Sequence, residues 1–363
     1  MRILIDIGHP GHVHLFKNLI TEFKRKGDAP LVTVRNIPAA KELLDLYKIP
    51  YIDLGNKSDS IKGKLINQIK YDLRLRRITN EHKIDLGIGT SITIAHVSKI
   101  SKARSIIFDD DDDKVQPLMT KFGHPFADMV ISPNSLIGKR KKKQTIFYDG
   151  YHELAYLHPK RFTPDSIILS EAGIKEGEKY FVLRFNAFKA HHDVGVSGIS
   201  QDNKMKLLKL LKNYGRVFIS VEREIEKEFE EYRIKIEPHK IHSLIFYATM
   251  FLGDSQTMTS EAALMGTPAL KCNTLAGKLA VPNEIEYKYD LCFSYQPDRF
   301  DLMLAKTEQL LSRENLKQEW ETKRDRMLND KIDVTAFLFW VVDNYPESIK
   351  EFRNNPDLQY QFK

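Results

Sequence analysis

Residues Ile3 to Gly27 read ILIDIGHPGHVHLFKNLITEFKRKG. The opening five residues are a near-continuous apolar run, which is typical of a strand buried on both faces. A short loop with two glycines follows, and apolar residues then recur at helical spacing until Gly27, which suits the C-cap of a helix. A strand, a tight loop and a helix in this order predict the first half of a βαβ unit in a parallel sheet.

The rest of the chain repeats this alternation in two series, separated by a turn-rich segment at residues 148–164. A chain of 363 residues is long enough for two domains, each with its own core. We therefore predict an α/β protein of two Rossmann-like, doubly wound parallel-sheet domains that face a cleft. The predicted parts are an N-terminal domain at residues 1–155, a C-terminal domain at residues 165–333, and a helix and tail at residues 334–363 that can pack back on the N-terminal domain.

The composition is that of an ordinary globular protein and excludes several classes. The two cysteines, Cys272 and Cys292, provide neither a disulfide framework nor zinc-site spacing, which indicates a reducing, cytoplasmic setting. The N-terminus lacks the pattern of a signal peptide. The longest apolar run, Val334 to Val342, is about half of what a bilayer crossing needs.

The formal net charge is +7, and much of the excess is concentrated at residues 57–77 and 139–143. Such patches suit anionic lipid headgroups or a phosphorylated substrate, although solvated surface lysines are an equal alternative. We find no nucleic-acid motif and expect no nucleic-acid partner. The first patch reads as a helix able to lie on anionic lipid at the inner face of the membrane, with these apolar residues among its basic ones: Ile61, Leu65, Ile66, Ile69 and Leu73.

Ligands of open parallel sheets bind outside the carboxyl ends of the strands, so the loops there are the candidate sites. The first is GHPGHVH, Gly8 to His14. Gly8 and Gly11 allow the backbone to approach a ligand, and the helix that follows is expected to offer its N–H groups to an anion. His9 is a candidate binding residue and His12 a candidate general base. A metal site made of the loop histidines is disfavoured by the strand–loop–helix geometry, and no metal is predicted.

The second loop is FDDDDDK, Phe108 to Lys114. Five adjacent aspartates repel one another unless a cation, a basic partner or water relieves them. A solvated acidic loop, a magnesium site, and one aspartate acting as a base or orienting a hydroxyl are the three interpretations. The candidate catalytic residues are Asp110 and Asp111.

The third stretch is DSQTMTSEAALMGTP, Asp254 to Pro268. We expect a helix that begins near Met258 with Thr257 as its N-cap, so that the first turn presents free N–H groups and hydroxyls to an anion. Glu261 then lies one position beyond a capping box, which leaves its carboxylate at the surface for the two hydroxyls of a ribose.

This third stretch is similar to the nucleotide-sugar motif of GT-B-fold glycosyltransferases and of UDP-N-acetylglucosamine 2-epimerases. The resemblance implies a GT-B fold in which Ser255, Gln256 and Thr257 face a diphosphate and Glu261 the ribose. The first loop resembles the G-x-G-G-H loop of MurG-type N-acetylglucosaminyltransferases at Gly8, Gly11 and His12.

Three segments together resemble the family called domain of unknown function 354, a match that spans nearly the whole chain. They are DIGHPGHVHLFKNLI, YDGYHELAYLHPKRFTPD and TMTSEAALMGTP. The H-R-x-E-N signature of the epimerases is missing, and the corresponding segment reads RFNAFKAHHD. Arg184 there is able to neutralise a diphosphate or to form a salt bridge, and His191, His192 and Asp193 lie just beyond it.

The resemblance implies a metal-independent glycosyltransferase of surface polysaccharide or glycolipid synthesis that needs no cofactor. A UDP-sugar donor would bind the C-terminal domain, and a sugar or lipid-linked acceptor would enter from the N-terminal domain. Alternatives are a UDP-sugar 2-epimerase or hydrolase, and a nucleotide-sugar binding protein without activity.

Overall fold

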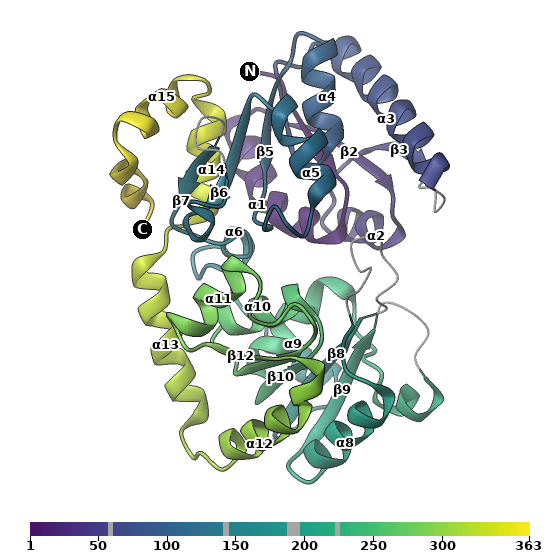
Figure 1. Ribbon diagram of the computed structural model, residues 1–363, viewed down its shortest axis with the longest axis vertical. Helices are drawn as coiled ribbons and strands as arrows, with labels where there is room; N and C mark the ends of the chain where they lie inside the picture. Colours follow the sequence, from purple (N-terminus) through teal and green to yellow (C-terminus); the bar gives the residue numbers. More distant parts are fainter. Residues whose placement is uncertain (57–60, 141–144, 187–196, 222–225) are drawn as a thin grey trace. The chain divides into compact units, whose positions relative to one another are not determined.

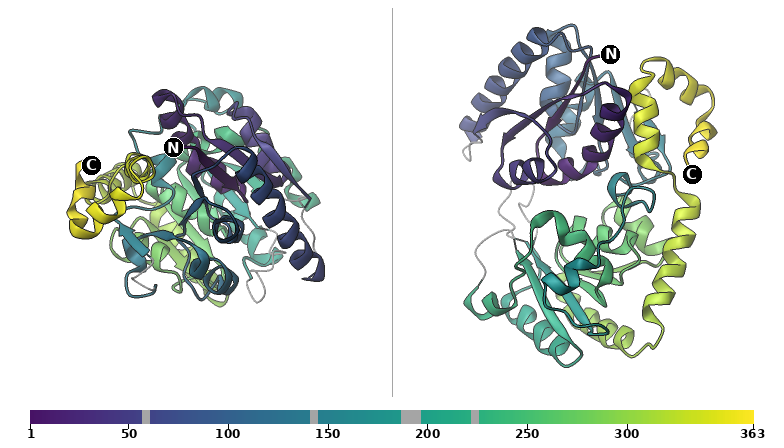
Figure 2. Two further views of the ribbon diagram at one scale, coloured as in Figure 1. Left: turned by 90° about the horizontal axis from the view of Figure 1, so that it is seen from above. Right: turned by 180° about the vertical axis from the view of Figure 1, so that it is seen from behind.

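The computed structural model describes residues 1–56, 61–140, 145–186, 197–221 and 226–363. The chain divides into two compact units (Figure 1, and from two further sides in Figure 2). Unit 1 comprises Met1–Arg161 together with Lys331–Lys363, and unit 2 comprises Phe162–Asp330. Unit 2 thus ends shortly before the predicted boundary at residue 333, and the C-terminal residues belong to unit 1.

Unit 1 is built on a seven-stranded sheet in the order β3-β2-β1-β4-β5-β6-β7, with parallel pairing throughout. Its strands are β1 (Ile3–Ile7), β2 (Leu31–Asn36), β3 (Ile52–Asn56), β4 (Leu86–Gly89), β5 (Arg104–Phe108), β6 (Met129–Pro133) and β7 (Thr145–Tyr148). Its α-helices are α1 (Pro10–Lys26), α2 (Pro38–Leu46), α3 (Ile61–Glu81), α4 (Ile92–Ile100), α5 (Pro117–Phe122), α6 (Leu154–Leu157), α14 (Val334–Asp343) and α15 (Glu347–Asn354). Short 3-10 helices are η1 (His124–Phe126), η2 (Asn134–Leu136) and η8 (Pro356–Phe362).

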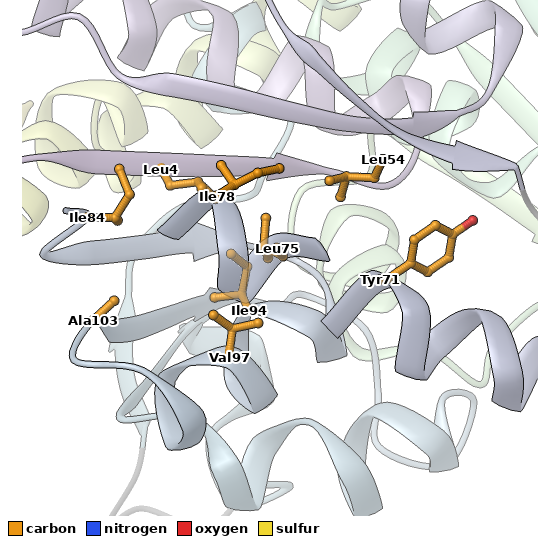
Figure 3. Close-up of a cluster of buried hydrophobic side chains, with 9 residues drawn as sticks. All are labelled: Leu4, Leu54, Tyr71, Leu75, Ile78, Ile84, Ile94, Val97 and Ala103. Atoms are coloured by element: carbon orange, nitrogen blue, oxygen red, sulfur yellow. The ribbon is translucent and has the colours of Figure 1, made fainter. Parts of the chain in front are cut away.

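The opening strand–loop–helix segment folds as its sequence predicts. All residues of β1 are buried, and successive side chains point to opposite faces of the sheet. On one face Leu4 packs against side chains of α3 and α4, such as Leu75 and Ile94, in the cluster of Figure 3. α1 ends at Gly27, whose φ of 95° is left-handed and favours glycine. Burial of β1 on both faces makes it a central strand of the sheet.

The C-terminal tail completes the core of unit 1. α14 packs on α1 and α6. The rings of Phe23 and Phe339 lie 4.9 Å apart between centroids, and Thr335 Oγ1 donates to the Ala155 carbonyl at 2.6 Å. Arg161 donates to both carboxylate oxygens of Asp333, at 3.0 and 2.8 Å from Nε. Residues far apart in sequence therefore form one hydrophobic core.

Unit 2 contains a five-stranded parallel sheet in the order β12-β11-β10-β8-β9. Its strands are β8 (Tyr180–Phe185), β9 (Arg216–Val221), β10 (Met250–Gly253), β11 (Ala269–Cys272) and β12 (Cys292–Tyr295). Its α-helices are α7 (Ile167–Glu171), α8 (Gln201–Lys212), α9 (Ile241–Tyr247), α10 (Gln256–Leu264), α11 (Ala280–Tyr287), α12 (Phe300–Leu311) and α13 (Leu316–Asp330), and its 3-10 helices are η5 (Lys227–Tyr232), η6 (Pro238–Lys240) and η7 (Pro297–Arg299).

The prediction of an α/β chain with two doubly wound, Rossmann-like parallel sheets is confirmed. Within the described part of the chain, no helix combines the length and the apolar character that a bilayer crossing requires.

Candidate functional site

Each sheet reverses its strand order at one place, and two of the three candidate loops lie at these reversals, whereas the aspartate loop follows β5. In unit 1 the reversal falls between β1 and β4, and in unit 2 between β8 and β10. Ligands of open parallel sheets bind in the crevice outside the strand ends at such a reversal. The loop after β1 begins with Gly8, and the segment after β10 begins with Asp254. Both predicted loops are therefore at the position that the fold rule selects.

In unit 2, α10 begins two residues earlier than the sequence predicts. Ser255 is the N-cap, with an extended backbone and a side chain that accepts from the Met258 N–H at 3.4 Å. Thr257 lies exposed within the first turn, so its assignment as the N-cap is wrong. Ser255 takes this role because it is the first residue after β10 and Asp254 with a hydroxyl able to reach the first turn. Gln256 and Thr257 become the first two residues of the helix.

Asp254 holds the ends of neighbouring strands together. Its carboxylate accepts from the Asn186 N–H at 2.7 Å, and its own N–H donates to the Arg184 carbonyl at 3.1 Å. A Cβ on Gly253 would lie 2.1 Å from that carbonyl, so only glycine allows the close approach of β10 to β8. Burial raises the pKa of Asp254 to about 6. This contact brings the α10 start beside the end of β8.

Arg184 lies at the end of β8 with 9% of its surface exposed. Its guanidinium donates to Ser220 Oγ of β9 at 2.8 Å. The structure thus brings Arg184 to the same strand edge as Ser255, although its side chain also serves the sheet. His191, His192 and Asp193 lie outside the described residues.

Glu261 is buried, with 5% of its surface exposed, where the sequence placed it at the surface. Its Oε1 lies 3.1 Å from Nε2 of His242 in α9. α10 packs on α9, and this packing places Glu261 beside His242. The carboxylate is therefore oriented by a histidine that the sequence did not single out.

One further buried cation in unit 2 was missed. Lys271 of β11 is 1% exposed, and its Nζ donates to Oε1 of Gln256 at the start of α10. The sequence contained a signal for this residue. Lys271 lies inside the apolar strand Ala269–Cys272, and lysine is almost never fully buried.

In unit 1, two histidines close the loop after β1. His9 Nδ1 accepts from the Gly11 N–H and His12 Nδ1 from the Gly8 N–H, each at 3.1 Å. The backbone N–H of His12 donates to the backbone carbonyl of His9 at 3.0 Å. The expectation that the start of α1 offers free N–H groups to an anion is therefore wrong for Gly11 and His12, since the loop satisfies these backbone groups itself.

His12 is held in its neutral form. The Thr90 hydroxyl lies 2.7 Å from both ring nitrogens. Because Nδ1 accepts from Gly8, the proton of the neutral ring is assigned to Nε2. Burial and the neighbouring imidazoles of His9 and His152 lower the pKa of His12 well below its ordinary value. These contacts leave His12 poorly placed to accept a proton.

The aspartate run divides into residues with different roles. Asp109 is buried and its carboxylate lies 2.6 Å from Nε2 of His124 and 2.9 Å from Nη1 of Arg140. Burial alone would raise the pKa of Asp109, but the contacts with His124 and Arg140 outweigh it and hold the pKa well below the ordinary value. Asp109 is a structural anion.

Asp110 pairs with a histidine from the end of the sheet. Its Oδ1 lies 3.1 Å from Nδ1 of His152, whose side chain is 11% exposed. Nε2 of His152 has no hydrogen-bond partner within the described residues. Burial lowers the pKa of His152, but the Asp110 carboxylate more than compensates, so the pKa is raised. The second nitrogen is buried and has no partner in the described part of the chain, and a carboxylate-oriented imidazole of this kind is the arrangement of a general base.

His152 lies beside Asp110 because α6 packs on α1. This packing brings the segment after β7 back across the edge of the sheet. The sequence segment YDGYHELAYLHP contains His152, but no local pattern distinguishes it from the other histidines there. Only the packing of α6 reveals it.

Asp111 is exposed, and repulsion by the adjacent carboxylates of Asp110 and Asp109 raises its pKa. Carboxylate oxygens of these three residues lie within 4.8 Å of one another. Two of the three already face protein cations, so the cluster alone supports no metal assignment.

The fold is that of GT-B glycosyltransferases and UDP-sugar epimerases. The UDP-GlcNAc 2-epimerase of Neisseria meningitidis, solved with UDP-GlcNAc bound, is 14% identical and superposes with a TM-score of 0.62 over 91% of this chain and 95% of that one. A glycosyltransferase of Rickettsia africae is 12% identical, with a TM-score of 0.58 over 96% of this chain and 98% of that one.

The chain belongs to the family described as "Protein of unknown function (DUF354)", whose model matches residues 1–291. The uncharacterized protein MJ0665 of Methanocaldococcus jannaschii is 24% identical over 287 residues, which are 74% of this chain and 81% of the relative. The resemblance found in the sequence is confirmed.

Substitution of the aspartates tests their different roles. Asp109→Asn leaves the Arg140 guanidinium (side chain 2% exposed) with only the more distant carboxylate of Asp113, 3.6 Å from Nε, and we expect the free energy of unfolding at pH 7 to fall by about 3 kcal/mol. Asp111→Asn removes carboxylate repulsion and should leave stability unchanged or slightly higher. Urea denaturation measures both, and equal losses would contradict the division.

The acid side of the stability profile gives a second readout. Because the folded pKa of Asp109 is depressed, its contribution is present above the unfolded value of about 4 and is lost as the pH falls further. Asp109→Asn should therefore flatten this acid limb.

Proposed function

We propose that this chain is a metal-independent glycosyltransferase that uses a UDP-sugar donor. Unit 2 binds the donor and unit 1 binds a sugar or lipid-linked acceptor of surface polysaccharide or glycolipid synthesis. The observation that carries the proposal is the reversal point of unit 2, where the Ser255 cap, the α10 start and Arg184 lie at the ends of adjacent strands.

The chemistry of that strand edge suits a diphosphate. The first-turn N–H groups of a helix lack intrahelical partners and carry the positive end of the helix dipole. The hydroxyls of Ser255 and Thr257 and the amide of Gln256 add polar groups, and a guanidinium such as that of Arg184 binds phosphate oxygens in pairs. These groups stabilise the departing diphosphate without a resident metal or cofactor. The epimerase solved with UDP-GlcNAc supports a nucleotide-sugar ligand for this fold.

Glu261 provides the first test. If its carboxylate, oriented by His242, accepts from the ribose hydroxyls, Glu261→Gln should weaken UDP binding by about tenfold or more, since charge-assisted bonds contribute roughly 1.5–3 kcal/mol each. Calorimetry measures the change. Glutamine keeps an acceptor oxygen for His242, so the fold should remain intact by circular dichroism.

Two controls accompany this test. For 2′,3′-dideoxy-UDP, wild type and variant should bind alike, because the hydroxyls are gone. Full affinity of Glu261→Gln for UDP would remove the ribose assignment, and a wild type that binds no nucleotide would remove the proposed function.

The second candidate is a UDP-sugar 2-epimerase or hydrolase, favoured by the epimerases among the proteins of this fold. The missing H-R-x-E-N signature argues against it. It predicts donor turnover without acceptor, whereas a binding protein without activity predicts binding and no turnover with any acceptor.

The acceptor base is proposed to be the Asp110–His152 pair rather than His12. The acceptor hydroxyl would transfer its proton to Nε2 of His152, while Asp110 stabilises the imidazolium. His152→Gln should lower turnover by about a hundredfold or more with UDP affinity unchanged. His12→Ala should lower it less, because both nitrogens of His12 already have contacts.

Steady-state rates of the two variants and of His82→Gln, an exposed control, make the comparison. A larger loss in His12→Ala than in His152→Gln would return the base to the loop after β1.

A peripheral membrane contact through α3 is part of the proposal. Ile66, Ile69 and Leu73 are 53%, 53% and 55% exposed at helical spacing, so they form one apolar stripe. Residues 57–60 and the side chains of Ile61 and Leu65 lie outside the described part of the chain. The stripe is flanked by exposed cations that complement anionic headgroups, and these are Lys70, Arg74, Arg76 and Arg77.

Vesicle sedimentation tests this contact. The chain should bind phosphatidylserine-containing vesicles and not neutral ones, with each cation contributing about 1 kcal/mol near the surface. Leu73→Glu should reduce binding, while Leu302→Glu, at the equally exposed Leu302 of unit 2 (56%), should not. Equal binding to both lipids, or equal losses in both variants, would contradict the assignment.

A further inference from the structure

Lys271 is a charged residue in an otherwise apolar strand. It lies in β11 between neighbours of β10 and β12, in register with Gly253 and Ser294, and is 1% exposed. Its ammonium donates to Oε1 of Gln256. Within the described part of the chain no carboxylate lies at ion-pair distance from it. An ammonium that is buried without a counter-ion is costly, and burial lowers the pKa of Lys271 to about 8.

The position of this charge makes the cost larger. Gln256 is the first residue of α10, so the ammonium lies at the positive end of the helix dipole. Lys317 provides the contrast in the same unit, because it donates to the carbonyl of Phe246 in the last turn of α9 and to that of Gly266 just beyond α10, where a cation is favourable. Lys317 satisfies helix ends, whereas Lys271 adds positive charge to a helix start.

The contact with Lys271 also determines the orientation of the side-chain amide of Gln256. An ammonium can only donate, so Oε1 must face Lys271 and the NH₂ group must point the other way. Nε2 of Gln256 has no hydrogen-bond partner among the residues described. A buried donor without a partner costs about 1–3 kcal/mol. Both the ammonium and the amide donor would be satisfied by one anion at the α10 start.

We propose that Lys271 is a positioning residue for the diphosphate of the donor: it turns the Gln256 amide toward the phosphates and supplies the buried positive charge that selects a nucleoside diphosphate over the bare nucleoside. This inference rests on the proposed function and adds a cation that does not depend on Arg184. The ligand class is a nucleoside diphosphate bound through its phosphates.

Proton linkage follows from the same arrangement. The ionisable groups that face Lys271 are Glu286 of α11 and Cys292 of β12, while Gln256 of α10 is neutral; Glu286 Oε1 accepts from the Ser294 N–H at 3.1 Å. A bound diphosphate favours the ammonium and raises the pKa of Lys271. Above pH 8 the free chain holds a growing fraction of neutral lysine, so binding must take up a proton, and affinity should fall as the pH rises.

Calorimetry of the full chain with UDP and with uridine tests the proposal. At pH 8.5, titrations in buffers of different ionisation enthalpy should show proton uptake on UDP binding by the wild type. Lys271→Met should abolish the uptake and weaken UDP binding at pH 7 about tenfold or more, with uridine affinity unchanged. Lys317→Met is the matched control and should keep both the affinity and the uptake.

A second variant keeps the proposal testable if Lys271→Met does not fold. Gln256→Glu gives the ammonium a carboxylate, so it should abolish proton uptake and weaken UDP binding, again without affecting uridine.

The possible results distinguish a failure of the proposed function from a failure of the role of Lys271. A wild type that binds neither UDP nor uridine overturns the proposed function. If both variants bind UDP with the affinity and the proton uptake of the wild type, the role of Lys271 is overturned and the proposed function stands. Equal loss of UDP and uridine affinity also overturns it, because that result indicates a structural role.

Discussion

Asp254 is the residue on which the organisation of unit 2 depends. Its carboxylate accepts from the Asn186 N–H just after β8, and its own N–H donates to the carbonyl of Arg184 within β8. Its carbonyl accepts from Nδ2 of Asn273, just after β11, at 2.9 Å. One buried residue thus joins the ends of three strands. Gly253 before it allows the backbones of β8 and β10 to approach, and Ser255 after it starts α10. The candidate donor site lies at this junction, because the pairing of Gly253 with Arg184 places the helix start and Arg184 at the same edge of the sheet.

The two units use buried charge in different ways. In unit 1 the buried carboxylate of Asp109 faces a histidine and an arginine, so its charge is compensated within the fold. In unit 2 the buried ammonium of Lys271 donates to the neutral amide of Gln256, and no carboxylate among the described residues lies at ion-pair distance from it. Compensated charge of the first kind orients neighbouring groups at little cost to the free chain. Uncompensated charge of the second kind destabilises the free chain and is relieved by an anion, which is the expected property of a ligand site.

Much of the fold was predictable because its signals are local. Apolar runs, helical spacing and glycine stops mark most strands and helices, and alternation of the two predicts parallel sheets. The loops were also predictable, since the strand-end rule needs only the order of the elements. The start of α10 was not, because Ser255 and Thr257 are both suitable caps and only the backbone path out of β10 selects Ser255.

The sequence by itself determined the class of fold, the family and the three loops that carry polar groups, because each is written in neighbouring residues. It could not assign roles to like residues within a run. Asp109, Asp110 and Asp111 are identical in type and adjacent, yet one faces Arg140, one faces His152 and one faces solvent. Nor could it show that Glu261 faces His242 or that Lys271 faces Gln256. These roles depend on partners distant along the chain, and only packing of the tertiary structure brings such partners within hydrogen-bond distance.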